Sequence, residues 1–318
     1  MTSIYPQEPT ARSRWIAERR GARNPVRRDR AYAQLLEREP MEDGSIQEVA
    51  TIFLTNRECP WKCVMCDLWR NTTPVAQGSI SKQIETALGE LPGAERATVL
   101  KLYNSGSFFD FGAIAQSEWP AIAKMCSQFD HVIVECHPRL VNGNLLRFAD
   151  MLNGTFEIAM GLETCHLEAL EKINKRITVA DFENAARFLH LHNISVRTFL
   201  LVGVPFIPEN QQEEWIRESI RVASDAGSNV ISLIPTRLGN GALDELARAG
   251  QFKEPQLADL ERAFAFALTE SGVRVFADTW DIERFCQCNR CAGARRSRLV
   301  RMNLSQELEP RVECACGC

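Results

Sequence analysis

Three cysteines lie close together in residues 56–67, which read NRECPWKCVMCD. Cys59, Cys63 and Cys66 have the spacing C-x3-C-x2-C, and they follow an apolar, β-branched run at residues 49–54. This order predicts a loop that leaves the C-terminal end of a strand, and Pro60 keeps the loop from becoming a helix. Three thiolates are one short of the four ligands that a closed structural metal site uses.

The presence of only three cysteines helps to decide between a structural zinc site and an iron–sulfur cluster. A structural zinc usually has two C-x2-C pairs, or cysteines with histidines, and the first histidine after this loop is His131. Closely spaced thiolates also hold iron–sulfur clusters, and a cubane bound by three cysteines leaves one iron free to bind another molecule. The alternatives are a zinc site completed by a distant ligand and three buried free thiols.

The loop resembles the signature of the radical S-adenosylmethionine (SAM) superfamily, in which C-x3-C-x2-C follows the first barrel strand. The resemblance implies a 4Fe-4S cluster on the three cysteines, with the fourth iron bound to the amino and carboxylate groups of SAM. Reduction would cleave SAM to methionine and a 5′-deoxyadenosyl radical, which abstracts a hydrogen atom from the substrate. The chain has Met65 where the family often has an aromatic residue, and a thioether can fill that space.

The composition is that of an ordinary globular protein. The 318 residues are 45% hydrophobic and 25% charged, with a formal net charge of −4. No apolar run approaches the ~20 residues of a transmembrane helix, and the start of the chain lacks a signal-peptide core. We therefore expect a cytoplasmic protein without a membrane partner, whose twelve cysteines indicate metal binding rather than disulfides. Nine of them fall into three tight groups, whereas Cys126, Cys136 and Cys165 are interpreted as small core residues.

Strands and helices are predicted to alternate from residue 47 onward, as in βα units around a parallel sheet. Strands are predicted near 49–55, 96–103, 131–136, 156–162, 194–202 and 229–235, with a further one near 273–277. Helices are predicted near 80–91, 113–128, 142–152, 179–192, 209–226 and 255–271. The pattern and the family resemblance together predict an α/β fold, a partial (β/α)6 TIM-like barrel.

Three regions are expected along the chain. Residues 1–45 form a basic N-terminal extension, with short helices near 15–20 and 31–38, residues 46–280 form the barrel, and residues 281–318 form a cysteine-rich tail. Residues 1–40 hold nine arginines against five acids. The extension is interpreted either as an arm that grips a polyanion such as nucleic acid or as a loosely packed, solvated segment.

The predicted strand ends carry the candidate SAM-binding residues, because the working residues of such barrels lie at the C-terminal ends of strands. Asn104, Ser105 and Gly106 stand where the family has a Gly-Gly-Glu-type motif that holds the SAM amino group, and this chain offers no carboxylate there. Glu163 ends another strand and resembles the family's ribose-side cluster. Its alternative role is an ion pair with Lys172 or Arg176 of the next helix.

The predicted strands near 194–202 and 229–235 carry the remaining candidate residues for SAM and the substrate. Arg197 lies inside an apolar strand, where an unpaired guanidinium is costly, so it is a candidate to hold the SAM carboxylate. Gly203 and Pro205 resemble the family's adenine-side turn, and Thr236 or Arg237 is a weaker candidate to face the substrate. No acid–base or nucleophile constellation stands out, so no catalytic residue is predicted.

The C-terminal tail is expected to hold a second metal. Six cysteines fall within 33 residues there: Cys286, Cys288, Cys291, Cys314, Cys316 and Cys318. The first three are expected to be ligands, with one of the last three as the fourth. The site is interpreted as an auxiliary iron–sulfur cluster or a structural zinc, the alternative being a flexible tail without metal.

The stretches at 104–108 and 161–178 narrow the resemblance to a branch of the superfamily. This branch includes the catalytic subunit of Elongator and the archaeosine-forming radical enzyme, which act on transfer RNA. The resemblance implies a transfer RNA base as substrate and a reductant such as flavodoxin or ferredoxin as partner. The alternatives are the same chemistry on a small molecule or peptide, and a non-catalytic iron–sulfur or zinc protein that binds nucleic acid.

Overall fold

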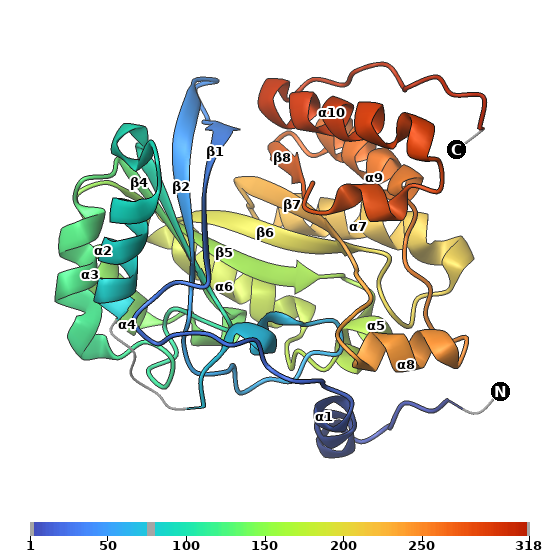
Figure 1. Ribbon diagram of the computed structural model, residues 1–318, viewed down its shortest axis with the longest axis horizontal. Coiled ribbons are helices and arrows are strands. Elements are labelled where there is room, and N and C mark those ends of the chain that lie inside the picture. The colour runs from blue at the N-terminus through green and yellow to red at the C-terminus, as the bar shows by residue number, and fades with distance from the viewer. Residues whose placement is uncertain (1–2, 75–79, 317–318) are drawn as a thin grey trace.

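The computed structural model describes residues 3–74 and 80–316, and its strands form one curled sheet (Figure 1). The sheet has eight strands in the order β1 to β8. β1 pairs antiparallel with β2, and every later pair from β2–β3 to β7–β8 is parallel. The strands are β1 (Ala33–Pro40), β2 (Ile46–Leu54), β3 (Val99–Asn104), β4 (His131–Glu135), β5 (Thr155–Glu163), β6 (Ser195–Val202), β7 (Val230–Pro235) and β8 (Arg274–Ala277). The predicted α/β partial barrel is confirmed.

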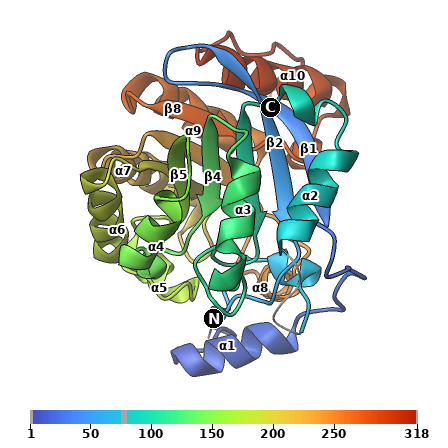
Figure 2. The same ribbon diagram turned by 90° about the vertical axis from the view of Figure 1, so that its left-hand side faces the viewer.

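Helices cover the convex face of the half-barrel and its two ends (Figures 1 and 2). The covering helices are α2 (Ile80–Glu90), α3 (Trp119–Cys126), α4 (Gly143–Ala149), α6 (Val179–Leu191), α7 (Gln212–Asp225) and α9 (Leu257–Glu270). α1 (Pro9–Glu18), α5 (Leu167–Lys172) and α8 (Ala242–Arg248) lie at one end of the sheet, and α10 (Asn289–Ser305) lies toward the other. Among the described residues, no helix combines the length and the hydropathy needed to cross a bilayer.

The two faces of the sheet bury different side chains, because successive residues of a strand point to opposite sides. Ile52, Leu100 and Val134 face outward and belong to the large core beneath the helices. Val49 and Ile133 face inward, together with half-buried aromatic residues such as Tyr103. The helices therefore pack against a largely apolar face, whereas the inner wall of the half-barrel is free to carry functional side chains.

The helix predicted near residues 31–38 is wrong, because this segment forms β1. Ala33 pairs with Phe53 and Pro40 with Ile46, around a turn in which Gly44 has a φ of 79°. The segment is rich in strong helix formers, but its ladder of hydrogen bonds to β2 outweighs that local preference. The sheet therefore begins inside the region that the sequence suggested to be an extension.

The N-terminal segment packs firmly on the barrel, unlike the loosely packed, solvated segment that was one of the two forms expected. Trp15 and Ile16 of α1 are buried, and Tyr5 donates a hydrogen bond to the carbonyl of Lys172 at 2.8 Å. The side chain of Arg12 is 3% exposed and pairs with Glu171 at 2.5 Å. These contacts join the start of the chain to α5, at the end of the sheet where the parallel strands terminate.

The opposite end of the half-barrel is closed by buried charges. Arg197 Nε lies 2.6 Å from Glu157 Oε1, and its Nη2 lies 2.9 Å from Glu39 Oε2. Lys101 pairs with Glu39 as well and with Glu37 at 2.9 Å. We call Glu39, Lys101, Glu157 and Arg197 the ionic floor. Each charge in it has a partner, which is the condition for burying charges at an acceptable cost.

Candidate metal and cofactor sites

The cysteine loop follows β2 and is held in place by backbone contacts from distant segments. Val64 N–H donates to the carbonyl of Ile173 at 3.0 Å. The side-chain amide of Asn174 donates to the Lys62 carbonyl at 2.8 Å, and that of Asn240 donates to the Val64 carbonyl at 2.7 Å. Polar groups of a buried loop need such partners. The loop is therefore a fixed part of the strand-end surface.

The turn after β3 lies directly against the first cysteine. Asn56 Nδ2 donates to the Ser105 carbonyl at 3.1 Å and its Oδ1 accepts from Ser105 N–H at 3.3 Å. Gly106 has a φ of +112°, and a Cβ added to it would lie 3.0 Å from the Cβ and 3.3 Å from the Sγ of Cys59. The predicted SAM-side residues Ser105 and Gly106 thus lie beside the predicted cluster ligand.

Gly106→Ala is expected to lower the iron content of the protein several-fold, because the added methyl group displaces Cys59. The backbone strain of a positive φ costs about 1 kcal/mol in addition. Gly44→Ala is the matched control, since Gly44 also has a positive φ but a Cβ there would have no neighbour within 4 Å. Both variants should lose stability, and only Gly106→Ala should lose iron. Equal iron contents after reconstitution would contradict the expected contact.

The surroundings of the three thiols favour binding to a cation. Burial raises the pKa of Cys59 to about 11 and that of Cys66 to about 12, and burial and the neighbouring Cys66 raise the pKa of Cys63 well above its ordinary value. A buried thiolate is therefore stable only beside positive charge, which a bound metal would supply. Trp61 of the same loop stacks on His137, with ring centroids 3.6 Å apart. Burial and Lys175 lower the pKa of His137 to about 3, so this ring is neutral.

Glu163 ends β5 and forms an ion pair with Lys175. The Glu163 side chain is 9% exposed and that of Lys175 is 11% exposed. Burial opposes the charge of Lys175, but Glu163 and the thiols of Cys63 and Cys59 outweigh it and raise the pKa of the lysine. The expected alternative of an ion pair is thus present, with Lys175 rather than Lys172 or Arg176 as the partner. The pair stays near the cysteine loop, where it can also meet a ligand.

The remaining predicted strand-end residues lie on the same edge. Both polar atoms of the Asn104 side chain are buried and lack a hydrogen-bond partner within the described part of the chain. Buried amides without partners are rare in proteins, so this side chain fits a polar ligand such as SAM. Gly203, with a φ of +77°, and its neighbour Val204 line a pocket of about 910 Å³ after β6, and Pro205 is buried beside them.

The predicted contact between Arg197 and the SAM carboxylate is wrong, because this arginine belongs to the ionic floor. Arg197 is the third residue of β6, so it lies near the start of the strand and far from the strand-end surface. Its guanidinium is already bound by Glu39 and Glu157. Of the weaker candidates, Arg237 pairs with Asp278 at 2.9 Å, while Thr236 Oγ1 is buried without a partner among the described residues.

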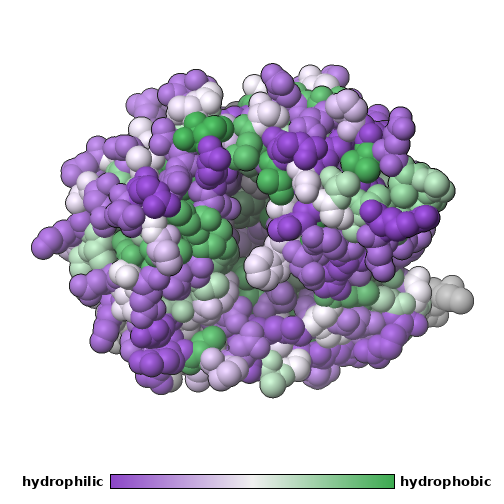
Figure 3. Space-filling view, turned by 45° about the horizontal axis from the view of Figure 1, so that its top comes forward, coloured by the Kyte–Doolittle hydropathy of each residue, from purple (hydrophilic) through white to green (hydrophobic). Residues whose placement is uncertain are grey.

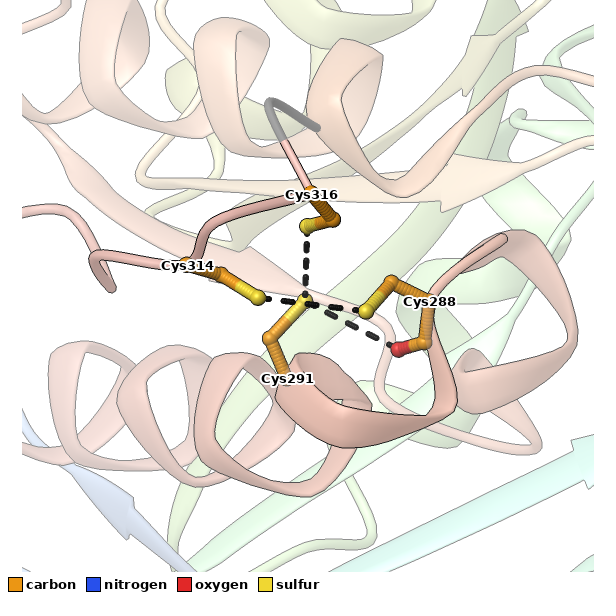
Figure 4. A group of neighbouring side chains, drawn as sticks. All are labelled: Cys288, Cys291, Cys314 and Cys316. Carbon is orange, nitrogen blue, oxygen red and sulfur yellow. Dashed lines mark hydrogen bonds between the residues drawn. The ribbon is translucent and has the colours of Figure 1, made fainter.

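Four cysteines of the C-terminal tail form a compact group (Figure 4). The Sγ atoms of Cys288, Cys291, Cys314 and Cys316 all lie within 4.8 Å of one another. The Cys288–Cys314 and Cys291–Cys316 sulfur distances are both 3.8 Å. Cys288 caps the N-terminus of α10, where the N–H groups of Cys291 and Arg290 lower the pKa of its thiol.

The composition of this group differs from the expected one. Cys286 was expected to be a ligand, but it is not among the four cysteines whose sulfurs all lie within 4.8 Å of one another. Its Sγ lies 4.0 Å from that of Cys291 alone and accepts a hydrogen bond from Arg295 at 3.6 Å. Arg295 in turn pairs with Glu261 at 2.6 Å. Both Cys314 and Cys316 take part, where one of the last three cysteines was expected. Cys318 lies outside the described residues.

Sequence reasoning missed the residues that act across long separations. Asn174 and Asn240 anchor the cysteine loop from positions 112 and 176 residues further along the chain. Lys175 pairs with Glu163 from only 12 residues away, but it was passed over for Lys172 and Arg176. Asn174 has a positive φ, a conformation that asparagine adopts more readily than most residues, so its identity is a weak local signal of a turn. This signal does not identify the loop that the turn supports.

No family model matches the chain. Among curated proteins, archaeosine synthase subunit beta of Thermococcus kodakarensis is 28% identical over 204 residues, which cover 61% of this chain and 63% of that protein. An uncharacterized protein of Methanocaldococcus jannaschii is 27% identical over 302 residues, or 86% of this chain and 81% of that protein. The chain thus spans less than two thirds of the Thermococcus subunit and most of the second relative.

Solved structures show the same fold at low sequence identity. Methylornithine synthase has a TM-score of 0.57 at 13% identity, covering 93% of this chain and 74% of that one. The Elp3 protein of Methanocaldococcus infernus has a TM-score of 0.54 at 12% identity, covering 80% and 63%. The chain has the radical SAM fold of these proteins. The expected resemblance to this superfamily and its archaeosine branch is confirmed, and the relatives support an enzyme.

Proposed function

We propose that this chain, which has the radical SAM fold, is a radical SAM enzyme that acts on a base of transfer RNA. The observation that carries the chemistry is the position of Cys59, Cys63 and Cys66 on a fixed loop at the strand ends. Gly106 lies against Cys59, and the unpartnered amide of Asn104 is near the same edge. When bound, a 4Fe-4S cluster and SAM would supply one-electron cleavage of SAM and a carbon radical for C–H activation.

The residues of the chain have definite roles in this proposal. Cys59, Cys63 and Cys66, which are half-buried, would hold the cluster. Ser105, Gly106 and Asn104 would receive the methionine part of SAM with backbone groups and an amide. Glu163 would accept hydrogen bonds from the ribose while keeping Lys175 as its counter-ion. Gly203 and Pro205 would border the adenine.

The chemistry is tested by electron paramagnetic resonance of the anaerobically reconstituted, reduced protein. We expect a cluster signal that changes when SAM is added, together with formation of 5′-deoxyadenosine. An intact cluster whose signal ignores SAM would favour the alternative, a non-catalytic iron–sulfur or zinc protein. The reductant in the cell would be a flavodoxin or a ferredoxin, and the name of the Thermococcus relative suggests a second subunit as a partner.

Transfer RNA is proposed as substrate because a relative 28% identical to this chain is a subunit of archaeosine synthase and because both ends of the chain are basic. Exposed arginines such as Arg14 and Arg28 lie on the N-terminal segment beside the strand ends. Phosphate contacts make binding fall steeply with salt concentration. Transfer RNA binding that is absent or insensitive to salt would leave a small molecule or a peptide as the substrate of the same chemistry.

The C-terminal group is proposed to bind one zinc ion rather than an auxiliary cluster. Four sulfurs held at ~2.3 Å in a tetrahedron lie about 3.8 Å from one another, and two sulfur pairs here have that separation. In a cubane each cysteine binds a different iron, so the sulfurs lie further apart. The observed spacing therefore supports a single tetrahedral ion on Cys288, Cys291, Cys314 and Cys316.

Cys288→Ser combined with Cys314→Ser is expected to lower the zinc content from about one ion per chain to nearly none. The cluster iron should stay unchanged, because the two sites use separate cysteines. The tail after α10 should become sensitive to protease, since the metal links residues 314 and 316 to the start of that helix. Cys126→Ser is the matched control, being a buried cysteine outside both groups. Loss of iron instead of zinc would favour the auxiliary cluster.

A further inference from the structure

The half-barrel encloses a chamber with an aromatic wall, between the ionic floor and the cysteine loop. Four rings follow one another across the inner face: the centroid distances are 5.7 Å for Tyr32–Phe53, 5.9 Å for Phe53–Tyr103 and 6.1 Å for Tyr103–Phe199. All four side chains are half-buried. The space-filling view shows that the surface is hollowed near its centre (Figure 3). The four rings are each partly exposed on the inner face of the half-barrel, so that face offers aromatic surface to a ligand.

Glu135 is a carboxyl group on the inner face of the half-barrel, at the end of β4. It ends β4 on the same face as the inward-facing Ile133, and it is half-buried. Its Oε2 accepts a hydrogen bond from Asn104 N–H at 3.2 Å. Within the described ranges, no lysine or arginine forms an ion pair with Glu135, because the nearby Lys175 is bound to Glu163. The carboxyl group thus has capacity for further hydrogen bonds, and nothing else in the mechanism uses it.

The electrostatic surroundings keep Glu135 in its acid form. Burial raises the pKa of Glu135 to about 8, and Glu163 adds to this, while Asn104 N–H and Lys175 lower it only in part. Tyr32 and Tyr103 are the other titratable groups close to it, and both are neutral phenols. A protonated carboxyl group presents one O–H donor beside one carbonyl acceptor. This donor and acceptor can hydrogen-bond together to the edge of a planar ligand on which a hydrogen-bond acceptor lies next to an N–H donor.

We propose that this chamber binds a single nucleobase, with its faces against the aromatic wall and its Watson–Crick edge hydrogen-bonded to Glu135. Enzymes that act on a base take it out of the stack and read it by edge contacts and aromatic stacking. Guanine fits this arrangement, because its O6 acceptor lies next to its N1–H donor. The inference rests on the proposed function, and it assigns the substrate base a place and a reading residue.

Binding of guanosine to the full chain, measured by saturation-transfer NMR and calorimetry, tests the proposal. Glu135→Gln keeps a donor beside an acceptor, so its affinity for guanosine should stay within about threefold of the wild type. Glu135→Leu removes both and should bind at least about tenfold more weakly, the range of a lost base-edge contact. 1-Methylguanosine lacks the N1–H donor and should bind the wild type weakly. Glu85→Gln, an exposed change on α2, is the matched control.

Other outcomes would overturn the proposal. If Glu135→Gln weakens guanosine binding as much as Glu135→Leu, the carboxylate acts as a counter-ion to a cation rather than as a reader of a base. If both variants lose SAM binding instead, Glu135 supplies the missing carboxylate for the SAM amino group. If guanosine does not bind at millimolar concentration, the chamber does not take a base. The leucine variant should remain folded, because it replaces a buried polar group by an apolar one.

The base-binding proposal and the proposed radical chemistry can be tested independently. Formation of 5′-deoxyadenosine by the wild type tests SAM cleavage and does not require the base site to be correct. If the wild type cleaves SAM but fails to bind guanosine, only the base site is refuted. If it binds guanosine through Glu135 but never cleaves SAM, the base site stands and the radical chemistry is refuted.

Discussion

Replacement of Cys59, Cys63 and Cys66 by alanine is expected to abolish SAM cleavage and to remove the iron of the SAM-binding cluster. The reason is that each thiolate would bind one iron, and no other cysteine belongs to this fixed loop. Without the cluster no electron reaches SAM, so 5′-deoxyadenosine should fall to background, a loss that matches enzymic accelerations of about 10⁶-fold or more. The measurements are iron content, the reduced-cluster resonance and product formation.

The control is Cys126→Ala, which removes a buried thiol of α3 and should keep both iron and activity. Cys126→Ala should lower stability slightly, because it removes a buried sulfur from the core, but it leaves the cysteine loop unchanged. The C-terminal metal should also survive in the triple variant, because its four cysteines lie elsewhere. A triple variant that still formed 5′-deoxyadenosine would contradict the assignment of the loop.

Arg197→Met is expected to destabilise the protein by about 3–5 kcal/mol, because it leaves buried carboxylates without their cation. Arg197 bridges Glu157 and Glu39, and the three side chains are 3%, 1% and 7% exposed. Methionine has an apolar side chain of similar length. The decrease in unfolding free energy should therefore come mainly from the unpaired carboxylates of Glu39 and Glu157 and less from lost packing. The measurement is the free energy of unfolding in urea at neutral pH.

Arg221→Met is the matched control, since Arg221 pairs with Glu218 on the surface, where the two side chains are 56% and 48% exposed. Such an exposed pair contributes at most about 1 kcal/mol. Adding Glu157→Gln to Arg197→Met should restore part of the lost stability by removing one unpaired charge. Equal losses for the Arg197 and Arg221 variants would show that the ionic floor does not contribute to stability as proposed.

The pH dependence of stability offers a check on the same network. Burial alone would raise the pKa of Glu39, but Arg197 and Lys101 outweigh burial and lower it to about 2 from an ordinary value of 4.5. A carboxyl group with a lowered pKa stabilises the fold above its unfolded pKa and loses that contribution as the pH falls. The difference in the free energy of unfolding between the wild type and Arg197→Met should therefore become smaller as the pH falls from about 4.5 to about 2.

The parts of this molecule that follow from local pattern could be predicted from the sequence. Continuous apolar runs such as Thr198 to Val202 identified buried parallel strands, and the C-x3-C-x2-C spacing identified the metal loop and its place after the first parallel strand. Both depend on residues that are close in the chain. The positions of Gly106 and Glu163 at the strand ends follow from the same alternation of strands and helices.

The parts that depend on distant partners could not be predicted. Arg197 looked like a ligand-binding residue because an arginine in an apolar strand needs a carboxylate, but Glu39 is 158 residues away in the chain. β1 contains helix-forming residues, and only its pairing with β2 makes it a strand. α10 was missed because its sequence is rich in arginine, although the buried Arg295 and Arg298 find Glu261 and the Glu309 carbonyl as partners.

The anchoring of the cysteine loop by Asn174 and Asn240 also sets an order of events during synthesis on the ribosome. The chain emerges N-terminus first, and these anchors follow the residues they hold by 112 and 176 positions. The loop therefore leaves the ribosome long before the groups that fix its backbone. On the proposed function, a cluster on this loop would be assembled late, and the three thiols would have to stay reduced and unmodified until β7 and the turn after it have been made.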